Sequence, residues 1–67
     1  MLVTINGESK TLNSGMTVLQ MLETLKIAPE RVVVELNMKI LKRDERARTE
    51  LKEGDSIEIV HFVGGGT

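Results

Sequence analysis

The sequence contains no cysteine, no tryptophan and no tyrosine, and it has only one phenylalanine, one proline and one histidine. A chain without cysteine can form no disulfide, bind no metal through thiolates and attack no substrate with a thiol. The single histidine, His61, excludes a histidine metal cluster within one chain. With so few aromatic side chains, the core of the fold must be built from leucine, valine, isoleucine and methionine.

The net charge and the distribution of apolar residues also exclude several classes of protein. The 67 residues carry a net charge of −1, which indicates no preference for nucleic acid or for a membrane surface. No apolar run approaches the ~20 residues that a membrane-spanning helix needs, and the opening MLVTINGE lacks the layout of a signal peptide. Apolar residues make up 40% of the chain and charged residues 28%, which is typical of globular domains. We therefore expect one small cytoplasmic domain without nucleic-acid or membrane partners.

Turn signals divide the chain into short strands. Asn6-Gly7 lies between two strand-like runs and predicts a β-hairpin, because both central residues of a type I′ turn need a positive φ. Further strands are predicted in RVVVEL, in the short KIL and in SIEIVHFV. Turns are predicted at NMK and at KEGDS, where Gly54 supplies the positive φ. The remaining segment, KRDERARTEL, has no clean period and is interpreted as a loop that holds one helical turn at most.

One helix is predicted over residues 18–26. Thr17 can cap this helix, and Gln20, three residues later, completes a capping box. Apolar residues then recur at helical spacing, so one stripe of the helix is expected to face a core. Pro29 is expected to stop the helix.

The order strand, strand, helix, strand, short strand, strand excludes a doubly wound sheet and favours an α+β fold. The economical packing is a mixed sheet of four to five strands, with the helix across one face and the first and last strands as central neighbours. This is the β-grasp (ubiquitin-like) arrangement. We expect the β-grasp domain to span residues 1–63 and residues 64–67 to form a flexible C-terminal glycine tail.

The glycine-rich tail, GGGT, has two interpretations. Glycine runs are usually flexible linkers, and a phosphate-binding loop is excluded because no helix follows the glycines in this sequence. Alternatively, Gly64, Gly65 and Gly66 could thread a channel too narrow for any Cβ and present a carboxylate to a neighbouring enzyme, which could activate it as an acyl-adenylate. On this second interpretation the folded domain serves for recognition by partners, and the reacting group is the carboxyl group at the end of the chain.

The β-grasp order of elements, the length, and the segments VVVELN and IEIVHFVGGG together resemble the ThiS family of sulfur carriers in thiamin biosynthesis. The resemblance covers the whole chain. Thr67 departs from the family, whose members normally end on glycine. Three alternatives stay open: the related MoaD family, which is the small subunit of molybdopterin synthase; a ubiquitin-like modifier; and a non-catalytic β-grasp interaction module with an inert tail.

The resemblance implies that the chain is not an enzyme and binds no cofactor or metal itself. An E1-like (ThiF-like) enzyme would use ATP and Mg²⁺ to adenylate Gly66 after the loss of Thr67. Sulfur from a donor such as a cysteine desulfurase would convert the adenylate to a thiocarboxylate. A thiazole synthase (ThiG-like) would then use that sulfur to build the thiazole ring. The absence of cysteine fits this implied role, since the sulfur is stored at the C-terminus.

Strand alternation predicts a partner-binding patch beside the tail. If RVVVEL pairs with SIEIVHFV, five side chains are expected together on the open face of the sheet: Val33, Glu35, Glu58, Val60 and Phe62. Scattered apolar side chains are normal on protein surfaces. The only aromatic side chain nevertheless lies next to the tail, which favours a docking patch.

Two other features receive structural interpretations. His61 falls on the inward face near the end of the last strand and is interpreted as a structural histidine. The segment from Lys39 to Lys52 is rich in basic side chains but has no interleaved aromatics, so it is interpreted as a solvated loop rather than a nucleic-acid site. Docking of this segment to an acidic partner surface stays open.

Overall fold

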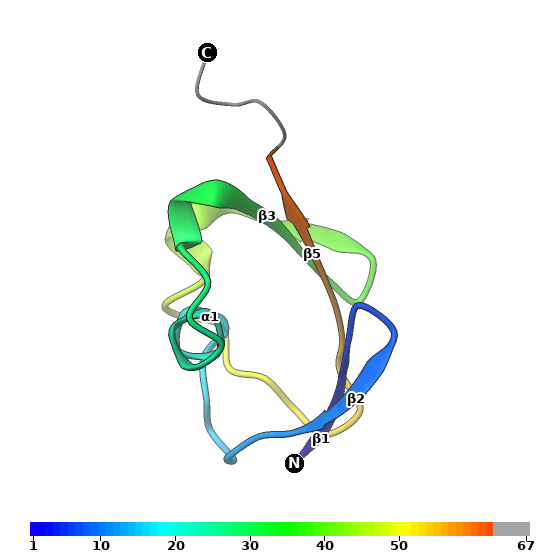
Figure 1. Ribbon diagram of the computed structural model, residues 1–67. Helices are drawn as coiled ribbons and strands as arrows, with labels where there is room; N and C mark the ends of the chain where they lie inside the picture. The colour runs from blue at the N-terminus through cyan, green and yellow to red at the C-terminus, as the bar shows by residue number, and fades with distance from the viewer. Residues whose placement is uncertain (63–67) are drawn as a thin grey trace.

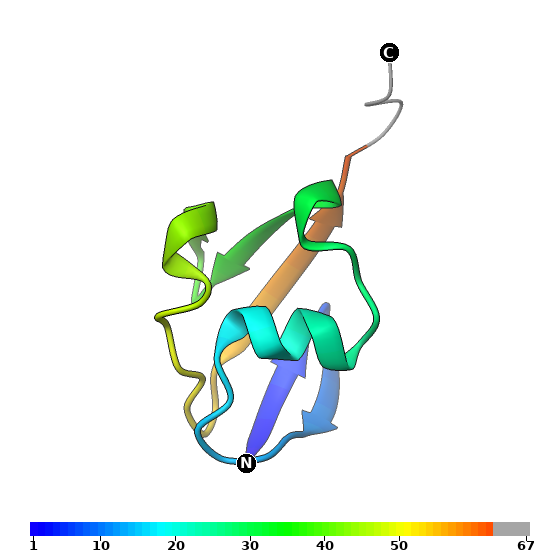
Figure 2. The same cartoon turned by 90° about the vertical axis from the view of Figure 1, so that its left-hand side faces the viewer.

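The computed structural model describes residues 1–62, in which five strands form one mixed sheet in the order β2-β1-β5-β3-β4. The strands are β1 (Leu2–Ile5), β2 (Glu8–Thr11), β3 (Val32–Leu36), β4 (Lys39–Leu41) and β5 (Ser56–His61). β1 runs parallel to β5, and every other pair of neighbours is antiparallel. The helix α1 (Val18–Thr24) lies across one face of the sheet (Figures 1 and 2). The predicted α+β β-grasp fold, with the first and last strands side by side in the sheet, is confirmed.

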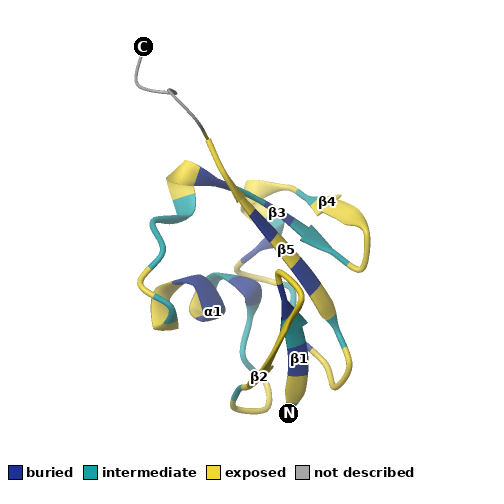
Figure 3. Ribbon diagram, turned by 45° about the vertical axis from the view of Figure 1, so that its right-hand side comes forward, coloured by how far each residue is buried: buried dark blue, intermediate teal, exposed yellow. Residues whose placement is uncertain are grey.

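The core lies between α1 and the sheet and is aliphatic, as the composition predicts. Alternate residues of β1, β3 and β5 point into it, which Figure 3 shows as alternating buried and exposed bands along β5. Full burial of one such side chain stabilises the fold by about 1.5–3 kcal/mol. The buried hydrophobic residues are Val3, Ile5, Val18, Met21, Leu22, Val32, Val34, Leu51, Ile57 and Ile59.

Two tight hairpins set the register of the sheet. Asn6 and Gly7 join β1 to β2 with φ angles of 50° and 82°, which confirms the predicted type I′ geometry. Asn37 and Met38 join β3 to β4 in the same way, with φ angles of 51° and 72°. Both loops have two residues, so each fixes which residues of its two strands face each other.

The N-terminus of α1 follows the prediction. The Thr17 side chain accepts a hydrogen bond from the Gln20 backbone N–H at 3.1 Å, and the Gln20 side chain accepts one from the Thr17 backbone N–H at 2.9 Å. This reciprocal capping box satisfies two donors that have no partner within the helix. The helix then buries one face, formed by Val18, Met21 and Leu22.

The expected end of the helix is wrong. α1 stops at Thr24, well before Pro29, because Lys26 adopts a left-handed conformation with φ 59°. The Lys26 N–H donates to the carbonyl of Glu23, and the Ile27 N–H donates to the carbonyl of Leu22. This pair of bonds is a Schellman motif, which normally uses glycine at the left-handed position. Pro29 instead begins the short 3-10 helix η1 (Pro29–Arg31).

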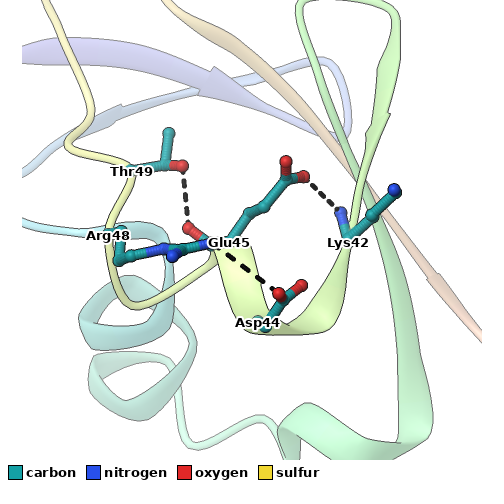
Figure 4. Close-up of polar contacts among 5 residues, drawn as sticks. All are labelled: Lys42, Asp44, Glu45, Arg48 and Thr49. Carbon is teal, nitrogen blue, oxygen red and sulfur yellow. Dashed lines mark hydrogen bonds and ion pairs between the residues drawn. The ribbon is translucent and has the colours of Figure 1, made fainter.

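The basic segment contains one short helical turn, the 3-10 helix η2 (Arg43–Glu45), which is the most that the sequence predicted for it. Figure 4 shows how this turn is held by its own side chains. Glu45 accepts a hydrogen bond from the Lys42 backbone N–H at 2.9 Å, and the Thr49 hydroxyl donates to the Glu45 carbonyl at 2.8 Å. An exposed ion pair joins Arg48 to Asp44 at 3.7 Å.

One residue of this segment contradicts its interpretation as a solvated loop. The Arg46 side chain is buried, with 4% of the residue exposed, and its guanidinium donates to the carbonyls of Pro29 at 2.7 Å and Val32 at 2.8 Å. The Arg46 carbonyl also accepts a hydrogen bond from the Leu19 N–H of α1. Burial lowers the pKa of Arg46, and the nearby charge of Arg43 lowers it further. Arg46 therefore ties the segment to α1 and to the start of β3.

Within residues 1–62, no helix has both the length and the apolar character needed to cross a membrane.

Candidate functional site

The candidate site lies where β5 leaves the sheet. β5 points toward the same end of the molecule as η1, opposite the N-terminus (Figures 1 and 2). The predicted reaction centre, Gly64, Gly65 and Gly66 with Thr67 after them, lies outside the described residues, as does its expected flexibility. The structure therefore describes the surface from which this segment starts.

The apolar part of the predicted patch is assembled by the pairing of β3 with β5. Val33 and Val60 are direct cross-strand partners, and Phe62 follows on the same face of β5 by alternation. Val60 and Phe62 are 54% and 53% exposed, whereas Val33 is half-buried. Because α1 covers the opposite face of the sheet, these three side chains form an open apolar surface beside the exit of the chain.

An acidic row borders this apolar surface. Glu35 on β3 and Glu58 on β5 are also direct cross-strand partners, so two carboxylates of like charge face each other. The structure thus brings together all five side chains predicted for the patch. It adds Ile40, which is paired with Glu35 from the β4 side and is 69% exposed. Alternation within KIL, combined with the two-residue turn at Asn37 and Met38, is the sequence signal that could have found Ile40.

Hydrogen bonds hold the end of β5 on both of its sides. The Phe62 N–H donates to the Arg31 carbonyl at 3.0 Å, which extends the ladder with β3 past the end of the strand. On the other side, the Asn6 amide bonds to both the N–H and the carbonyl of Ile59. The last described residue therefore leaves the sheet from a defined position.

His61 does not have the structural role that was expected. It pairs with Val32 across β3 and β5 and belongs to the inward series of β5, but its side chain is exposed. Its cross-strand partner Val32 is buried in the core, whereas along β5 the last buried residue is Ile59. His61 is thus a surface group next to the tail.

The described surface is suited to binding another protein. Among residues 1–62, no three histidine, cysteine or acidic side chains are grouped so that they could hold a metal ion. The site instead consists of exposed apolar side chains, two carboxylates and a strand that leads outward. Exposed apolar side chains with a polar border are typical of protein interfaces.

Comparison with known proteins gives a family match over nearly the whole chain. The ThiS family model matches residues 3–66, so Thr67 lies outside the match. The sulfur carrier protein ThiS of Bacillus subtilis is 40% identical over 50 residues, which are 75% of this chain and 76% of that protein. A solved structure gives the same result: the crystal structure of the thiamine biosynthesis protein (ThiS) from Geobacter metallireducens superimposes with a TM-score of 0.86 at 39% identity, covering 98% of this chain and 100% of that one.

A much longer protein also contains a similar segment. The thiazole synthase of Magnetococcus marinus is 41% identical over 66 residues, which are 98% of this chain but only 20% of that protein. The chain thus spans about a fifth of the length of this relative. In that relative, a segment similar to this whole chain makes up one fifth of the polypeptide, and the other four fifths are additional sequence.

Proposed function

The chain belongs to the ThiS family, and from that premise we propose that it carries sulfur as a thiocarboxylate on Gly66 for the formation of the thiazole ring. As a ThiS protein it is a sulfur carrier of thiamine biosynthesis and not an enzyme. The family match favours this pathway over molybdopterin synthesis, the alternative that the sequence left open. It equally favours a carrier over a protein modifier or an inert interaction module.

The proposed chemistry takes place on the terminal carboxyl group of Gly66. The carboxylate attacks the α-phosphorus of ATP, pyrophosphate leaves, and an acyl-adenylate forms. The outer sulfur of a cysteine persulfide then attacks the carbonyl carbon and displaces AMP, which leaves an acyl disulfide to the donor. A second thiol attacks the donor's cysteine sulfur, forms a disulfide with it and releases the thiocarboxylate. ATP and Mg²⁺ belong to the activating enzyme, since this chain supplies only the acyl group.

Two observations support Gly66 as the reacting residue. The family match extends to Gly66 and stops there. The first of the three glycines lies two residues after Phe62, so a partner that binds the exposed Val60 and Phe62 has the glycines within a few residues of the bound patch. Each extended residue spans about 3.3–3.6 Å, which puts the carboxyl group of Gly66 within roughly 15 Å of Phe62.

The partners are an E1-like (ThiF-like) adenylating enzyme, a sulfur donor such as a cysteine desulfurase, and a thiazole synthase. Support for the thiazole synthase comes from the Magnetococcus marinus relative, in which a segment like this chain is joined to a much longer protein of that name. A permanent covalent link raises the effective concentration of two domains that act together. We place the carrier in the cytoplasm, where ATP is available for its activation.

The proposal predicts a defined mass change. Incubation of the carrier ending at Gly66 with the activating enzyme, ATP, Mg²⁺ and a sulfur donor should add the mass of one sulfur-for-oxygen exchange. Fragmentation should locate the added mass on Gly66. Omission of ATP is the control and should leave the mass unchanged. Conjugates of higher mass with other proteins would instead indicate a modifier, and an unchanged mass in the full reaction would contradict the sulfur-carrier chemistry.

The docking patch makes a second prediction. Val60→Lys and Phe62→Glu should each weaken binding to the activating enzyme or to the synthase by roughly tenfold or more, as expected when a central apolar contact of an interface is lost. Both side chains are more than half exposed, so the fold should remain intact. Calorimetric titration measures the affinity, and circular dichroism checks the fold.

Leu2→Glu provides a matched control for the patch. Leu2 is 49% exposed, close to the exposure of Val60 and Phe62, but it lies at the start of β1, far from the tail. This variant should bind its partners as wild type does. Equal weakening by all three variants would show that the patch has no special role.

A further inference from the structure

The side chain of Asn6 makes contacts that a turn residue does not need. The Ile59 N–H donates to its Oδ1 at 2.7 Å, and its Nδ2 donates to the Ile59 carbonyl at 3.2 Å. These two bonds join residues that are 53 positions apart in the sequence. The turn itself requires only a residue with a positive φ at this position, which glycine would also provide. The turn therefore does not explain why the side-chain amide is present.

The length of β1 explains why these bonds matter. The parallel ladder between β1 and β5 ends with the pair Ile5 and Ile57, and the Asn6 N–H adds one more bond to the Ile57 carbonyl at 2.8 Å. β5 nevertheless continues to His61. Along this stretch β3 is the neighbour on one side, and the Asn6 amide takes the place of a β1 residue on the other. A primary amide has one donor and one acceptor face and can therefore imitate a backbone peptide group.

We propose that Asn6 is a positioning residue for partner docking, an inference that rests on the proposed function. Its amide holds the tail-proximal part of β5 (Ile59 to Phe62) in the plane of the sheet. Val60 and Phe62 are then presented as one surface with Val33. Without the amide, this part of β5 would pair with β3 alone, and two-stranded ribbons twist more than wider sheets do. Docking would then have to be preceded by ordering of the strand, which weakens binding.

Asn37 provides an internal control for this inference. It occupies the same position in the second type I′ turn, with φ 51° against 50° for Asn6, and its side chain also makes two hydrogen bonds. Its Oδ1 accepts from the Ser56 N–H at 2.9 Å, and its Nδ2 donates to the Asp55 carboxylate at 3.0 Å. Asn37 thus holds the beginning of β5, whereas Asn6 holds the end that leads to the tail.

The test compares Asn6→Gly with Asn37→Gly. Glycine accepts the positive φ of both turns, so each substitution removes two side-chain hydrogen bonds without straining the backbone. The Asn6 bonds are partly buried and the Asn37 bonds are exposed, so we expect Asn6→Gly to lower the urea midpoint somewhat more, and binding is measured where both variants are fully folded. Asn6→Gly should bind the activating enzyme about tenfold more weakly than wild type, the factor that the loss of one to two net hydrogen bonds produces. Asn37→Gly should bind within about twofold of wild type.

Amide hydrogen exchange gives a second readout that a general loss of stability would not reproduce. The Ile59 amide should exchange roughly tenfold faster in Asn6→Gly than in Asn37→Gly, and the Ser56 amide should show the reverse order. Should Asn6→Gly fail to fold, Asn6→Asp tolerates the positive φ and removes only the donor to the Ile59 carbonyl. The binding comparison with Asn37→Gly then applies, whereas the Ile59 amide keeps its acceptor and should stay protected.

The outcomes separate this inference from the proposed function. If wild-type carrier fails to bind the activating enzyme, the proposed function is wrong and the inference falls with it. If wild type binds and the two glycine variants bind equally well, or are equally weakened, only the positioning role of Asn6 is wrong. Selective weakening in Asn6→Gly, under conditions where both variants are fully folded, supports it.

Discussion

A carrier ending at Gly66 should be adenylated on the order of a hundredfold faster than the 67-residue chain. Thr67 moves the carboxylate by one residue, which is about 3.5 Å of extended chain. A displacement of even ~1 Å can cost on the order of a hundredfold in rate at a reacting centre. The β-branched side chain of threonine also widens the chain where the channel of the activating enzyme is expected to be narrowest.

ATP–pyrophosphate exchange with the activating enzyme measures this difference directly. A chain that ends at Gly66 but carries Gly66→Ala separates the two causes, because it keeps the carboxylate in place and adds only a Cβ. Mass spectrometry of the protein from its native cells would show whether a form ending at Gly66 exists there. If the 67-residue chain exchanges as fast as the shorter one, glycine need not be terminal in this carrier.

Features that depend on neighbouring residues could be predicted from the sequence. Asn6-Gly7 fixed the first hairpin, and Thr17 with Gln20 fixed the start of α1, because each signal and its structural effect lie within four residues. Once the strands were assigned, alternation placed Val33, Glu35, Glu58 and Val60 on one face of the sheet, and the register confirms this by pairing Val33 with Val60 and Glu35 with Glu58. A period of two leaves only one choice of face for each residue.

Features that depend on distant residues, or on a backbone conformation that the residue type disfavours, could not be predicted in this way. The end of α1 is set by Lys26 in a left-handed conformation, which the sequence gives no reason to expect of lysine. Whether His61 is buried depends on which segments cover the end of β5, and alternation carries no information about that cover. The bonds of the Asn6 side chain to Ile59 are possible because β5 extends beyond the end of β1, and only the assembled sheet shows this difference in length.

Arg46 is the clearest case of such a distant dependence. In the sequence it is one of several basic residues, with nothing to distinguish it from Arg43 or Arg48. In the structure its guanidinium donates to the carbonyls of Pro29 in η1 and of Val32 at the start of β3. The Arg46 Nε atom is buried and has no hydrogen-bond partner within the described part of the chain. The charge remains, since arginine is effectively always protonated in proteins.

Arg46→Ala should lower the free energy of unfolding by about 2–3 kcal/mol. The substitution leaves a cavity and deprives two carbonyls of their donors, and each of these effects costs on the order of 1–3 kcal/mol. Relief from the cost of burying a charge offsets part of this loss. A chain of 67 residues has a total stability of roughly 3–10 kcal/mol, so the loss is a large share of the whole. Urea unfolding monitored by circular dichroism measures it.

Arg48→Ala is the matched control for this substitution. The Arg48 side chain is 70% exposed, and its ion pair with Asp44 lies at the surface, so its removal should change the stability by no more than about 0.5 kcal/mol. Arg46→Lys should fall between the two, because an ammonium group keeps the charge but lacks the fork that reaches two carbonyls at once. Arg46→Ala as mild as Arg48→Ala would contradict a structural role for the buried guanidinium.

Arg46→Ala should also weaken the hydrogen bond that holds Phe62 at the end of the sheet. The Arg31 carbonyl, which accepts the Phe62 N–H, lies in the sequence between the Pro29 and Val32 carbonyls that Arg46 holds. Loss of the guanidinium should therefore loosen η1 and speed hydrogen exchange at the Phe62 amide relative to Arg48→Ala, under conditions where both variants remain folded. An unchanged rate at Phe62, together with the expected loss of stability, would restrict Arg46 to supporting the core and leave the anchoring of the tail to the β3–β5 ladder and Asn6.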